Sequence, residues 1–263
     1  MHVELNDEVM WVTGGGAGIG RAIALEAARS GARVAVTDLD ADALSEVVYS
    51  IQEAGGEGFA VVGDVTVPEQ MKAAVDQIVE KWGKLTAVCV NAGINGTWAP
   101  VDEICVEEWK KTIDINLTGS FLTVHYAVPH LRNAGGGSIA ILSSVNGTRV
   151  FSNEGASAYA SSKAGQLALG QMLALELAPS RIRVNVICPG AFDTGIHAKT
   201  EKRDLDEIET PVEFPEGKIP LTHGEMGKPE QVGQLVVFLA SKAAGHITGS
   251  PVWIDGAESL LQG

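Results

Sequence analysis

Short apolar runs alternate with amphipathic segments along almost the whole chain. The apolar runs are continuous, and most are bounded by glycine, proline or polar residues. We expect strands at 9–13, 33–37, 58–62, 85–90, 138–143, 183–187 and 251–254, and helices at 18–30, 41–54, 68–82, 106–133, 156–179 and 229–241. Continuous apolar strands are typical of a parallel sheet with helices on both faces. The pattern therefore predicts the α/β class: a doubly wound parallel sheet of about seven strands, flanked by helices on both faces.

One segment, residues 192–228, departs from this alternation. It is long and charged and contains Pro211, Pro215 and Pro220; within 199–216, seven acidic residues stand against three basic ones. A long irregular segment in a compact domain is usually a functional loop. Since no linker-like stretch and no internal repeat occurs elsewhere, we expect residues 1–263 to form a single domain, with 192–228 as a lid over a substrate site.

The composition argues against several classes of partner. The 263 residues carry a net charge of −14, whereas nucleic acids and anionic membranes bind basic surfaces. Three cysteines without C-x-x-C spacing, and six histidines without zinc spacing, predict neither a disulfide framework nor a metal site. The first eight residues show no targeting pattern, and no apolar run reaches the roughly 18 residues of a membrane span. We expect a cytoplasmic protein with a small-molecule partner, and neither nucleic acid nor membrane.

The first predicted strand ends in a glycine-rich turn, Thr13-Gly14-Gly15-Gly16-Ala17-Gly18-Ile19-Gly20, that leads directly into a helix. Glycines allow a tight turn, and the backbone N–H groups at a helix N-terminus favour a pyrophosphate. In this strand–turn–helix context the motif predicts dinucleotide binding at Gly14, Gly16, Gly18, Ile19 and Gly20. The alternative is a turn with a purely structural role.

Asp38 follows the second predicted strand, 18 residues after Gly20. A carboxylate at this place accepts hydrogen bonds from ribose hydroxyls and repels a 2′-phosphate. Neither Leu39 nor Asp40, which follow it, brings a basic side chain. The expected cofactor is therefore NAD rather than NADP, with Asp38 and Leu39 in its site. The alternative is that Asp38 is only a turn or cap residue before the helix at 41.

Two further strand ends carry residues suited to the same site. Asp64 and Val65 follow the third strand, and Asn91-Ala92-Gly93 follows the fourth. Ligands of open α/β sheets bind at the carboxyl ends of the strands. We therefore expect all of these residues at the cofactor, with Asp64 bonding the adenine amine and Val65 beside the ring.

Tyr159 and Lys163 lie one turn apart in the predicted helix 156–179, so both side chains leave the same helix face. An ammonium beside a phenol favours the phenolate and lowers its pKa, which predicts a general acid/base able to work near neutral pH. By itself the spacing is also compatible with a solvated helix face.

Together these residues resemble the short-chain dehydrogenase/reductase (SDR) family, whose members have a Rossmann-type sheet. The similarity runs from about residue 8 to 257 and involves several motifs in the family's order. They are Thr13-Gly14-x-x-x-Gly18-x-Gly20, Asp64, Asn91-Ala92-Gly93, Asn116, Ser144, Tyr159-x-x-x-Lys163, and Pro189-Gly190 with Thr194. The resemblance implies a nicotinamide-dependent oxidoreductase that assembles as a homotetramer or homodimer.

The resemblance also implies roles for four catalytic residues. Tyr159 is the general acid/base at the substrate oxygen, and Lys163 lowers its pKa and binds the nicotinamide ribose. Ser144 hydrogen-bonds the substrate oxygen. Asn116 helps to hold a water that links Lys163 to solvent.

The remaining implied cofactor contacts follow the strand predicted at 183–187. Thr194, together with the backbone near Phe192, would hold the nicotinamide carboxamide, beside the Pro189-Gly190 turn. Phe192 stands where the family usually has Val or Ile, which narrows the expected site near the nicotinamide. The sequence Asp255-Gly256-Ala257 replaces the family's frequent Asp-Gly-Gly, a change that we expect to be neutral.

The interval between Ser144 and Tyr159 is slightly longer than the family's commonest spacing. We expect Asn153-Glu154-Gly155 to carry the extra length in a loop beside the pocket. Ser143 is the alternative catalytic serine, but Ser144 fits the family's pattern through Ser144-Val145-Asn146-Gly147.

The sequence thus predicts an NAD(H)-dependent oxidoreductase that interconverts a secondary alcohol and a ketone. Polar residues around the site favour a sugar, a polyol or another small hydroxylated substrate. The candidate substrate residues are Ser144, Asn146, Glu154, Trp98, Phe192 and His197. The alternative within the class is a 3-oxoacyl thioester reductase, and the alternative from another class is a catalytically silent NAD-binding regulator or scaffold. A sugar-nucleotide epimerase or dehydratase would need a larger C-terminal domain.

Overall fold

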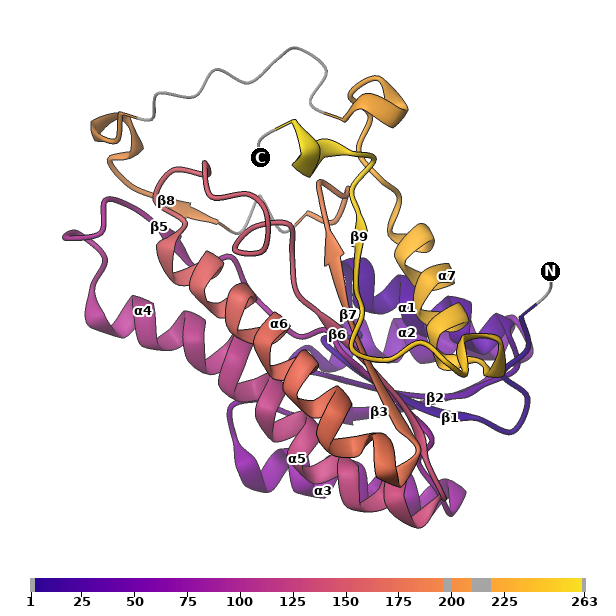
Figure 1. Ribbon diagram of the computed structural model, residues 1–263. Coiled ribbons are helices and arrows are strands. Elements are labelled where there is room, and N and C mark those ends of the chain that lie inside the picture. Colours follow the sequence, from indigo (N-terminus) through magenta and orange to yellow (C-terminus); the bar gives the residue numbers. More distant parts are fainter. Residues whose placement is uncertain (1–2, 196–199, 210–218, 262–263) are drawn as a thin grey trace.

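The computed structural model describes residues 3–195, 200–209 and 219–261. In this part of the chain seven parallel strands form one sheet, in the order β3-β2-β1-β4-β6-β7-β9 (Figure 1). They are β1 (Val9–Thr13), β2 (Arg33–Asp38), β3 (Glu57–Val62), β4 (Ala87–Val90), β6 (Gly137–Leu142), β7 (Ile182–Pro189) and β9 (Pro251–Ile254). The order runs outward from β1 to β3 and then resumes at β4 on the other side of β1. This confirms the predicted doubly wound sheet and sets its switch point, where such sheets bind ligands, between β1 and β4.

Helices cover both faces of the sheet (Figure 1). One face carries α1, α2 and α7, and the other carries α3, α5 and α6, with α4 beside α6. The helices are α1 (Gly18–Arg29), α2 (Ala41–Glu53), α3 (Pro68–Trp82), α4 (Val106–Ile113), α5 (Gly119–Asn133), α6 (Ser157–Leu177) and α7 (Pro229–Ala240). None of the described helices combines the length and the apolar character needed to cross a membrane.

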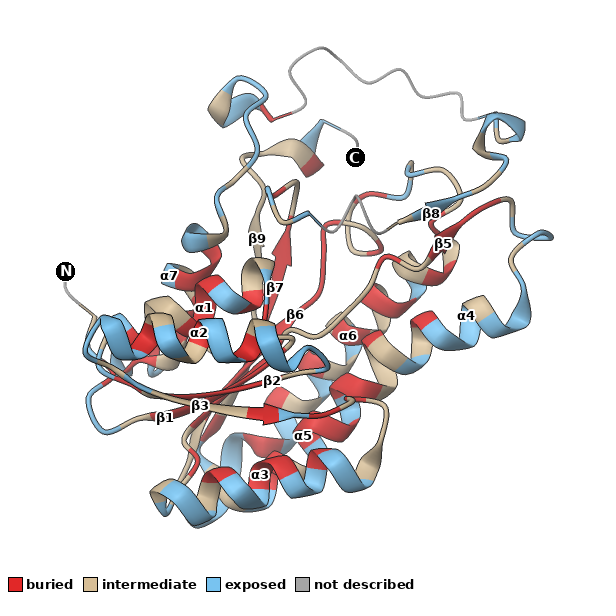
Figure 2. Cartoon of the chain, turned by 180° about the vertical axis from the view of Figure 1, so that it is seen from behind, coloured by how far each residue is buried: buried red, intermediate tan, exposed pale blue. Residues whose placement is uncertain are grey.

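Strand β1 explains why its sequence is apolar without alternation. Its side chains point to opposite faces in turn, and each face is buried: Met10 and Val12 belong to the core under α1, α2 and α7, whereas Val9 and Trp11 belong to the core under α3, α5 and α6. Figure 2 shows β1 and β7 as buried segments between the two helix layers, whereas the edge strands β3 and β9 are mostly of intermediate burial. A sheet covered on both sides therefore favours hydrophobic residues on both faces of its inner strands.

The helix predicted over 106–133 is interrupted. After α4, residues Asp114–Thr118 form a π-helical turn before α5 begins at Gly119. At the centre of this turn Asn116 is fully buried, and its backbone carbonyl accepts a hydrogen bond from the Ser120 hydroxyl at 2.6 Å. A Cβ on Gly119 would approach Val65 Cγ2 to 2.8 Å, so glycine lets the new helix start close to the end of β3. Such turns are frequent at functional sites.

The described part of the 192–228 segment carries structure that the sequence pattern does not predict. β8 (Glu201–Lys202) pairs in parallel with β5 (Thr97–Trp98), and the Arg203 N–H donates to the Trp98 carbonyl at 3.0 Å. The Arg203 guanidinium also donates to both Glu108 carboxylate oxygens at 3.1 Å. This pairing lowers the pKa of Glu108 to about 2. Residues 200–209 are thus attached to α4 and to the loop after β4.

Candidate active site

The glycine-rich turn is packed so closely that only glycine fits at several of its positions. Gly14 and Gly18 have φ of 64° and 51°, in the left-handed region that favours glycine. A Cβ on Gly14 would lie 2.8 Å from Ala92 Cα, and a Cβ on Gly20 would overlap the Gly14 carbonyl oxygen. The turn opens on α1, whose first turn has no side-chain cap at Ala17 and no acidic residue. Uncapped N–H groups behind a glycine turn suit a pyrophosphate.

Asp38 faces this turn from the end of β2. Its Oδ2 accepts the Gly16 N–H at 3.0 Å, and its Oδ1 accepts the Leu39 N–H at 2.8 Å. The helix-cap alternative belongs to a different residue, because Asp40 Oδ1 accepts the N–H groups of Asp42 and Ala43, both at 3.0 Å. The carboxylate of Asp38 is therefore held at the mouth of the glycine turn, while Asp40 caps α2.

The polar residues at the ends of β3 and β4 brace the same edge of the sheet. The Asn91 amide donates to the carbonyl oxygens of Thr13 and Gly14 at 3.0 Å each, which ties the glycine turn to β4. Asp64 Oδ1 accepts the Thr66 N–H at 2.8 Å and the Thr66 hydroxyl at 2.7 Å. Both side chains thus hold the backbone around the site, a role that the sequence pattern does not predict.

The two adjacent serines after β6 have different partners. The Ser143 hydroxyl donates to the Lys163 backbone carbonyl at 2.7 Å, so it anchors α6. Ser144 Oγ accepts the Asn146 N–H at 3.1 Å, and its hydrogen bond with Tyr159 acts to lower the pKa of that phenol. Ser144 rather than Ser143 thus lies beside the tyrosine hydroxyl.

Tyr159 and Lys163 share the interior face of α6, and the Lys163 Nζ lies 5.5 Å from the centre of the tyrosine ring. Burial dominates both groups: it raises the pKa of Tyr159 above its usual 10 and lowers the pKa of Lys163 to about 8. The net direction for Tyr159 is opposite to the one predicted from the tyrosine–lysine spacing. The physical reason is that the phenolate is desolvated in this site, and the hydrogen bond from Ser144 does not outweigh that cost.

Asn116 links the loop after β4 to α6. Its Oδ1 accepts the Ile94 N–H at 2.8 Å, while its Nδ2 donates to the Ile94 carbonyl and to Ser162 Oγ, both at 2.9 Å. A Cβ on Gly93 would lie 3.1 Å from Asn116 Oδ1 and 3.5 Å from Lys163 Nζ, so the bare glycine backbone passes close to both groups. The π-turn therefore delivers Asn116 to the centre of the predicted catalytic set.

One residue in contact with Lys163 was not predicted from the sequence. Gln166, three residues after Lys163, is fully buried, and its Oε1 accepts the Lys163 ammonium at 2.9 Å. The available signal was a polar residue at helical spacing from Lys163 on the buried face of α6, because buried polar groups are normally placed to meet partners.

The segment after β7 returns over the glycine turn. The Ala191 N–H donates to Glu258 Oε2 at 3.0 Å, and the Gly190 N–H donates to the Ile254 carbonyl at 3.0 Å. Thr194 lies over α1, since a Cβ on Gly18 would meet Thr194 Cβ at 3.4 Å. The predicted Pro189–Thr194 contacts and the glycine turn are therefore brought together, and Glu258 is a supporting residue that no motif indicated.

The structure bears on two expectations here, that Phe192 contacts substrate and that Ala257 is a neutral replacement of glycine. The Phe192 ring is 5% exposed and packs against Gly227, so it is a core residue, and this packing does not favour its predicted contact with substrate. Ala257 adopts a left-handed conformation with φ of 72°, which is costly for any residue with a Cβ. Its replacement of glycine is therefore not neutral for the backbone. His197 falls outside the described residues.

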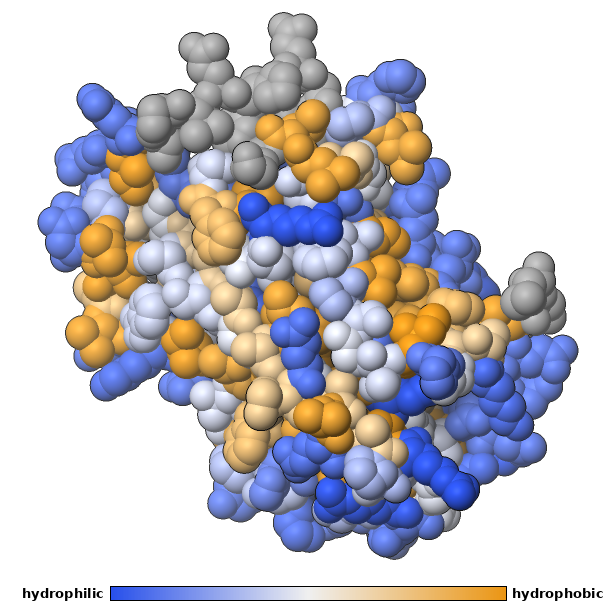
Figure 3. Space-filling model, in the orientation of Figure 1, coloured by the Kyte–Doolittle hydropathy of each residue, from blue (hydrophilic) through white to orange (hydrophobic). Residues whose placement is uncertain are grey.

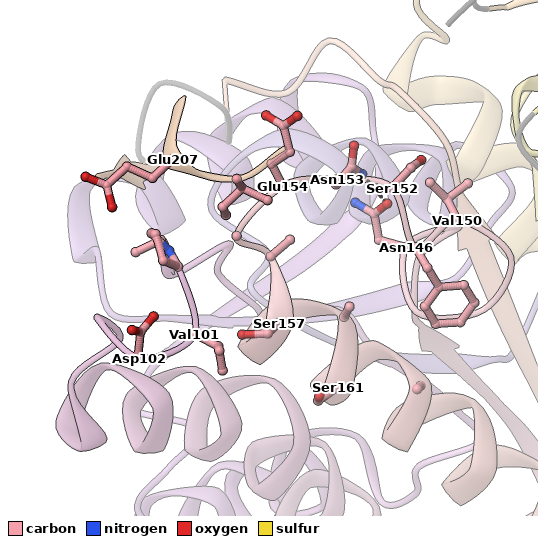
Figure 4. Close-up of a pocket in the computed structure, with 18 residues that line it drawn as sticks. Val101, Asp102, Asn146, Val150, Ser152, Asn153, Glu154, Ser157, Ser161 and Glu207 are labelled. Atoms are coloured by element: carbon pink, nitrogen blue, oxygen red, sulfur yellow. Dashed lines mark hydrogen bonds between the residues drawn. The ribbon is translucent and has the colours of Figure 1, made fainter. Parts of the chain in front are cut away.

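Three of the predicted substrate-binding residues, Trp98, Asn146 and Glu154, lie near Tyr159 or line a pocket beside α6. The Trp98 ring is buried with its centre 6.4 Å from that of Tyr159, and its indole N–H donates to the Asn95 carbonyl at 3.2 Å. Asn146 and Glu154 line a pocket of about 710 Å³ between the 146–157 loop, the start of α6 and the loop before α4 (Figure 4). Its polar lining includes Asp102, Asn146, Ser152, Asn153, Glu154, Ser157, Ser161 and Glu207.

This pocket adjoins the catalytic residues without containing them. Among the described residues that line it, α6 contributes Ser157, Ala160, Ser161 and Ala164, and neither Ser144 nor Tyr159 is present. Asn153 donates a hydrogen bond to Asn146 Oδ1, so the loop folds back on itself next to Ser144. Asn146 thus connects this pocket to Ser144, the predicted catalytic serine.

The arrangement agrees with known proteins over nearly its whole length. A family model described as enoyl-(acyl carrier protein) reductase matches residues 14–257. The cyclohexanol dehydrogenase of Acinetobacter sp. (strain SE19) is 36% identical over 257 residues, which cover 98% of this chain and 97% of that protein.

Two solved structures extend the similarity to the fold. A 3-ketoacyl-ACP reductase from Sinorhizobium meliloti 1021 superposes with a TM-score of 0.91 at 46% identity, covering 96% of this chain and 99% of that one. A 7α-hydroxysteroid dehydrogenase complexed with NADH and 7-oxo glycochenodeoxycholic acid gives a TM-score of 0.84 at 31% identity, with 97% and 95% covered.

Proposed function

The chain belongs to the short-chain dehydrogenase/reductase family of oxidoreductases, and from this we propose that it is an NAD(H)-dependent enzyme that interconverts a small hydroxylated secondary alcohol and its ketone. The observation that carries the proposal is the convergence of Ser144, Tyr159 and Lys163 at the sheet edge where the glycine turn opens. A proton donor, a hydrogen-bond partner and a nucleotide cradle at one place are what hydride transfer at a carbinol carbon requires.

The residues at the glycine turn fit a nicotinamide dinucleotide. Gly14 and Gly20 let the turn fold tightly against Ala92 and against its own backbone, and the uncapped N-terminus of α1 that follows suits the pyrophosphate. Thr194, which lies over Gly18, would hold the carboxamide end. A bound nicotinamide supplies the acceptor or donor of the hydride.

Asp38 favours NAD over NADP. Its carboxylate is oriented by the N–H groups of Gly16 and Leu39, in a position that suits ribose hydroxyls. A 2′-phosphate there would meet a fixed negative charge. Neither Leu39 nor Asp40 offers a compensating positive charge.

The proton chemistry belongs to Tyr159. In ketone reduction the phenol donates its proton to the carbonyl oxygen, and in alcohol oxidation the phenolate takes the hydroxyl proton. Ser144 donates a hydrogen bond to the same oxygen, and the Lys163 ammonium favours the phenolate. Because burial raises the pKa of Tyr159, oxidation should speed up as the pH rises, until the ammonium of the pair is lost.

Substrate class is the more specific part of the proposal. The polar side chains of Asn146, Asn153 and Glu154 in the pocket support a hydroxylated substrate, and the ring of Trp98 provides an apolar surface beside Tyr159. A 3-oxoacyl thioester is the second candidate, favoured by the 46% identity to a 3-ketoacyl-ACP reductase. The net charge of −14 opposes it, because an acidic carrier protein requires a basic docking surface.

Parallel assays decide between these two substrate classes. We expect reduction of NAD with cyclic alcohols, polyols or sugars to exceed the reverse reaction with acetoacetyl-coenzyme A by at least about tenfold in kcat/KM. A preference for the thioester, or for NADPH as its reductant, would transfer the assignment to the second candidate.

Part of the 192–228 segment supports a lid. Residues 200–209 are held to the body by the β5–β8 pairing and by Arg203 with Glu108. Leu205 lies against Gly155, where a Cβ would approach Leu205 Cδ2 to 2.6 Å. We therefore propose that residues 200–209 form one wall of the substrate site.

A homotetramer, or at least a homodimer, is the proposed assembly. Large hydrophobic residues are exposed on α4, α5 and α6, namely Trp109, Phe121, Met172 and Leu175. Figure 3 shows hydrophobic side chains among the polar ones on the face of the molecule where α5 and α6 lie. Light scattering coupled to size exclusion should give four times, or twice, the 27.5 kDa chain mass. A monomer at micromolar concentration would be incompatible with this assembly.

A further inference from the structure

Gln166 is fully buried, and both its amide oxygen and its amide nitrogen form hydrogen bonds. Its Oε1 accepts the Lys163 Nζ at 2.9 Å, and its Nε2 donates to the Asn116 carbonyl at 2.9 Å and to Ser120 Oγ at 2.7 Å. An amide has two N–H donors, so both are satisfied. A buried polar side chain satisfied on both sides forms a rigid link, here between α6 and the π-turn.

The hydrogen bonds of the Lys163 ammonium fix its orientation. Of the three donors of an ammonium, one reaches the Leu142 carbonyl at 3.0 Å and one reaches Gln166 Oε1. The third has no acceptor among the described residues, on a group that lies 5.5 Å from the centre of the Tyr159 ring. Gln166 thereby helps to aim one N–H of Lys163 into the catalytic site.

The Asn116 carbonyl completes the link. It already accepts the Ser120 hydroxyl at 2.6 Å and the Gln166 amide at 2.9 Å, which matches the two lone pairs of a carbonyl oxygen. Because the same Gln166 amide also accepts from Lys163 at 2.9 Å, one side chain connects the lysine directly to the π-turn.

We propose that Gln166 is a positioning residue for the oxidoreductase reaction: its amide forms a fixed bridge between Lys163 and Asn116 that holds the lysine charged and aimed at Tyr159. The proposal rests on the proposed function of the site. A residue that only packed α6 against α5 would contribute volume and stability, whereas this role depends on the polar atoms of the amide.

The charges around Lys163 make its protonation sensitive to this bridge. Among the described residues, the titratable groups facing its ammonium are Tyr159 on α6 and Cys188 on β7. Burial raises the pKa of Cys188 to about 11, so that thiol is neutral near pH 8. The loop after β4 and the π-turn present only Gly93 and Asn116, both uncharged. Among these groups there is no carboxylate that could accept a hydrogen bond from Lys163 in place of Gln166.

The test compares two substitutions that separate polarity from volume. Gln166→Met keeps the length of the side chain and excludes water, but removes both polar ends. Gln166→Ala leaves a polar cavity that water can enter, because the Lys163 and Asn116 groups remain as its partners. Gln171→Met is the matched control, on the exposed side of the same helix.

We expect Gln166→Met to shift the ascending limb of the kcat–pH profile for alcohol oxidation to higher pH by about half to one unit, because a hydrogen bond to a charged group is lost. Gln166→Ala should recover most of the wild-type profile. The melting temperatures should fall in the opposite order, with the alanine variant below the methionine variant, because alanine leaves the larger cavity.

A second readout uses the ligand-free protein. Competitive acetylation followed by peptide mass spectrometry gives the pH midpoint at which Lys163 becomes reactive, with the exposed Lys110 as internal reference. The midpoint should be lower in Gln166→Met than in the wild type and close to the wild type in Gln166→Ala. If Gln166→Met does not fold, Gln166→Leu serves as the apolar variant.

Wild-type profiles and midpoints in all variants would overturn the proposal, as would activities that merely follow the melting temperatures. Failure of the proposed function is distinguishable from these outcomes: the wild type would then oxidise no alcohol at all, and the ligand-free Lys163 midpoints would still decide the role of Gln166.

Discussion

Tyr159→Phe should lower kcat by about 10²–10⁴-fold, the usual contribution of general acid/base catalysis, with little effect on cofactor affinity. The change removes only the hydroxyl that lies beside Ser144, while the ring can still pack near Trp98. The measurement is steady-state turnover of the best alcohol substrate, together with NADH binding followed by fluorescence.

Tyr126→Phe is the matched control, because Tyr126 lies on α5 against His125 and away from the catalytic set. It should leave kcat within about twofold of the wild type, because this partly buried side chain packs against the core at a distance from the catalytic residues. Wild-type turnover in Tyr159→Phe would refute the assignment of the proton to this residue. Loss of cofactor binding along with turnover would indicate that the hydroxyl is needed to build the site.

The second large effect concerns cofactor choice. The double change Asp38→Ala with Leu39→Arg should lower the preference for NAD over NADP, measured as the ratio of kcat/KM values, by about 10²–10³-fold. Like charges in contact cost several kcal/mol, and each 1.4 kcal/mol is about a factor of ten. The side chain of Leu39 is well exposed next to Asp38, so an arginine can reach a 2′-phosphate without repacking.

Asp40→Ala provides a control two residues away in the same turn. It removes the cap of α2, which should cost about 1 kcal/mol of stability, but it should leave the cofactor ratio unchanged. If Asp40→Ala altered the ratio as much as the double change, the preference would arise from the shape of the turn. A wild type that already prefers NADP would contradict the role assigned to Asp38.

The fold was predictable because the hydrophobic pattern of each strand reflects which of its faces are buried. β1 is apolar from Val9 to Val12, because Met10 and Trp11 enter different cores, and this pattern can be recognised from the strand's own sequence. The glycine turn was equally predictable, because φ above zero and backbone contact at Gly14 leave no room for a side chain. The resemblance to the SDR family, which these motifs carried, is confirmed.

What the sequence did not reveal depends on contacts between distant residues. The π-turn and Gln166 are joined by a hydrogen bond between residues 50 positions apart, and the spacing of Gln166 from Lys163 indicates a buried polar residue without showing its partner on the π-turn. Asp38 and Asp40 are chemically identical neighbours, so only the path of the backbone decides which one caps α2. The pKa of Tyr159 is set by burial that its spacing from Lys163 cannot report.

The most direct test of the account is reduction of NAD by the wild-type protein over a panel of cyclic secondary alcohols, polyols and sugars. The account predicts turnover of at least one of them at about 1–10³ per second, the usual range for enzymes, and at least about 100-fold less in Tyr159→Phe. A protein that binds NAD but oxidises no alcohol, and reduces no ketone or 3-oxoacyl thioester, would contradict it and would instead be a nucleotide-binding regulator.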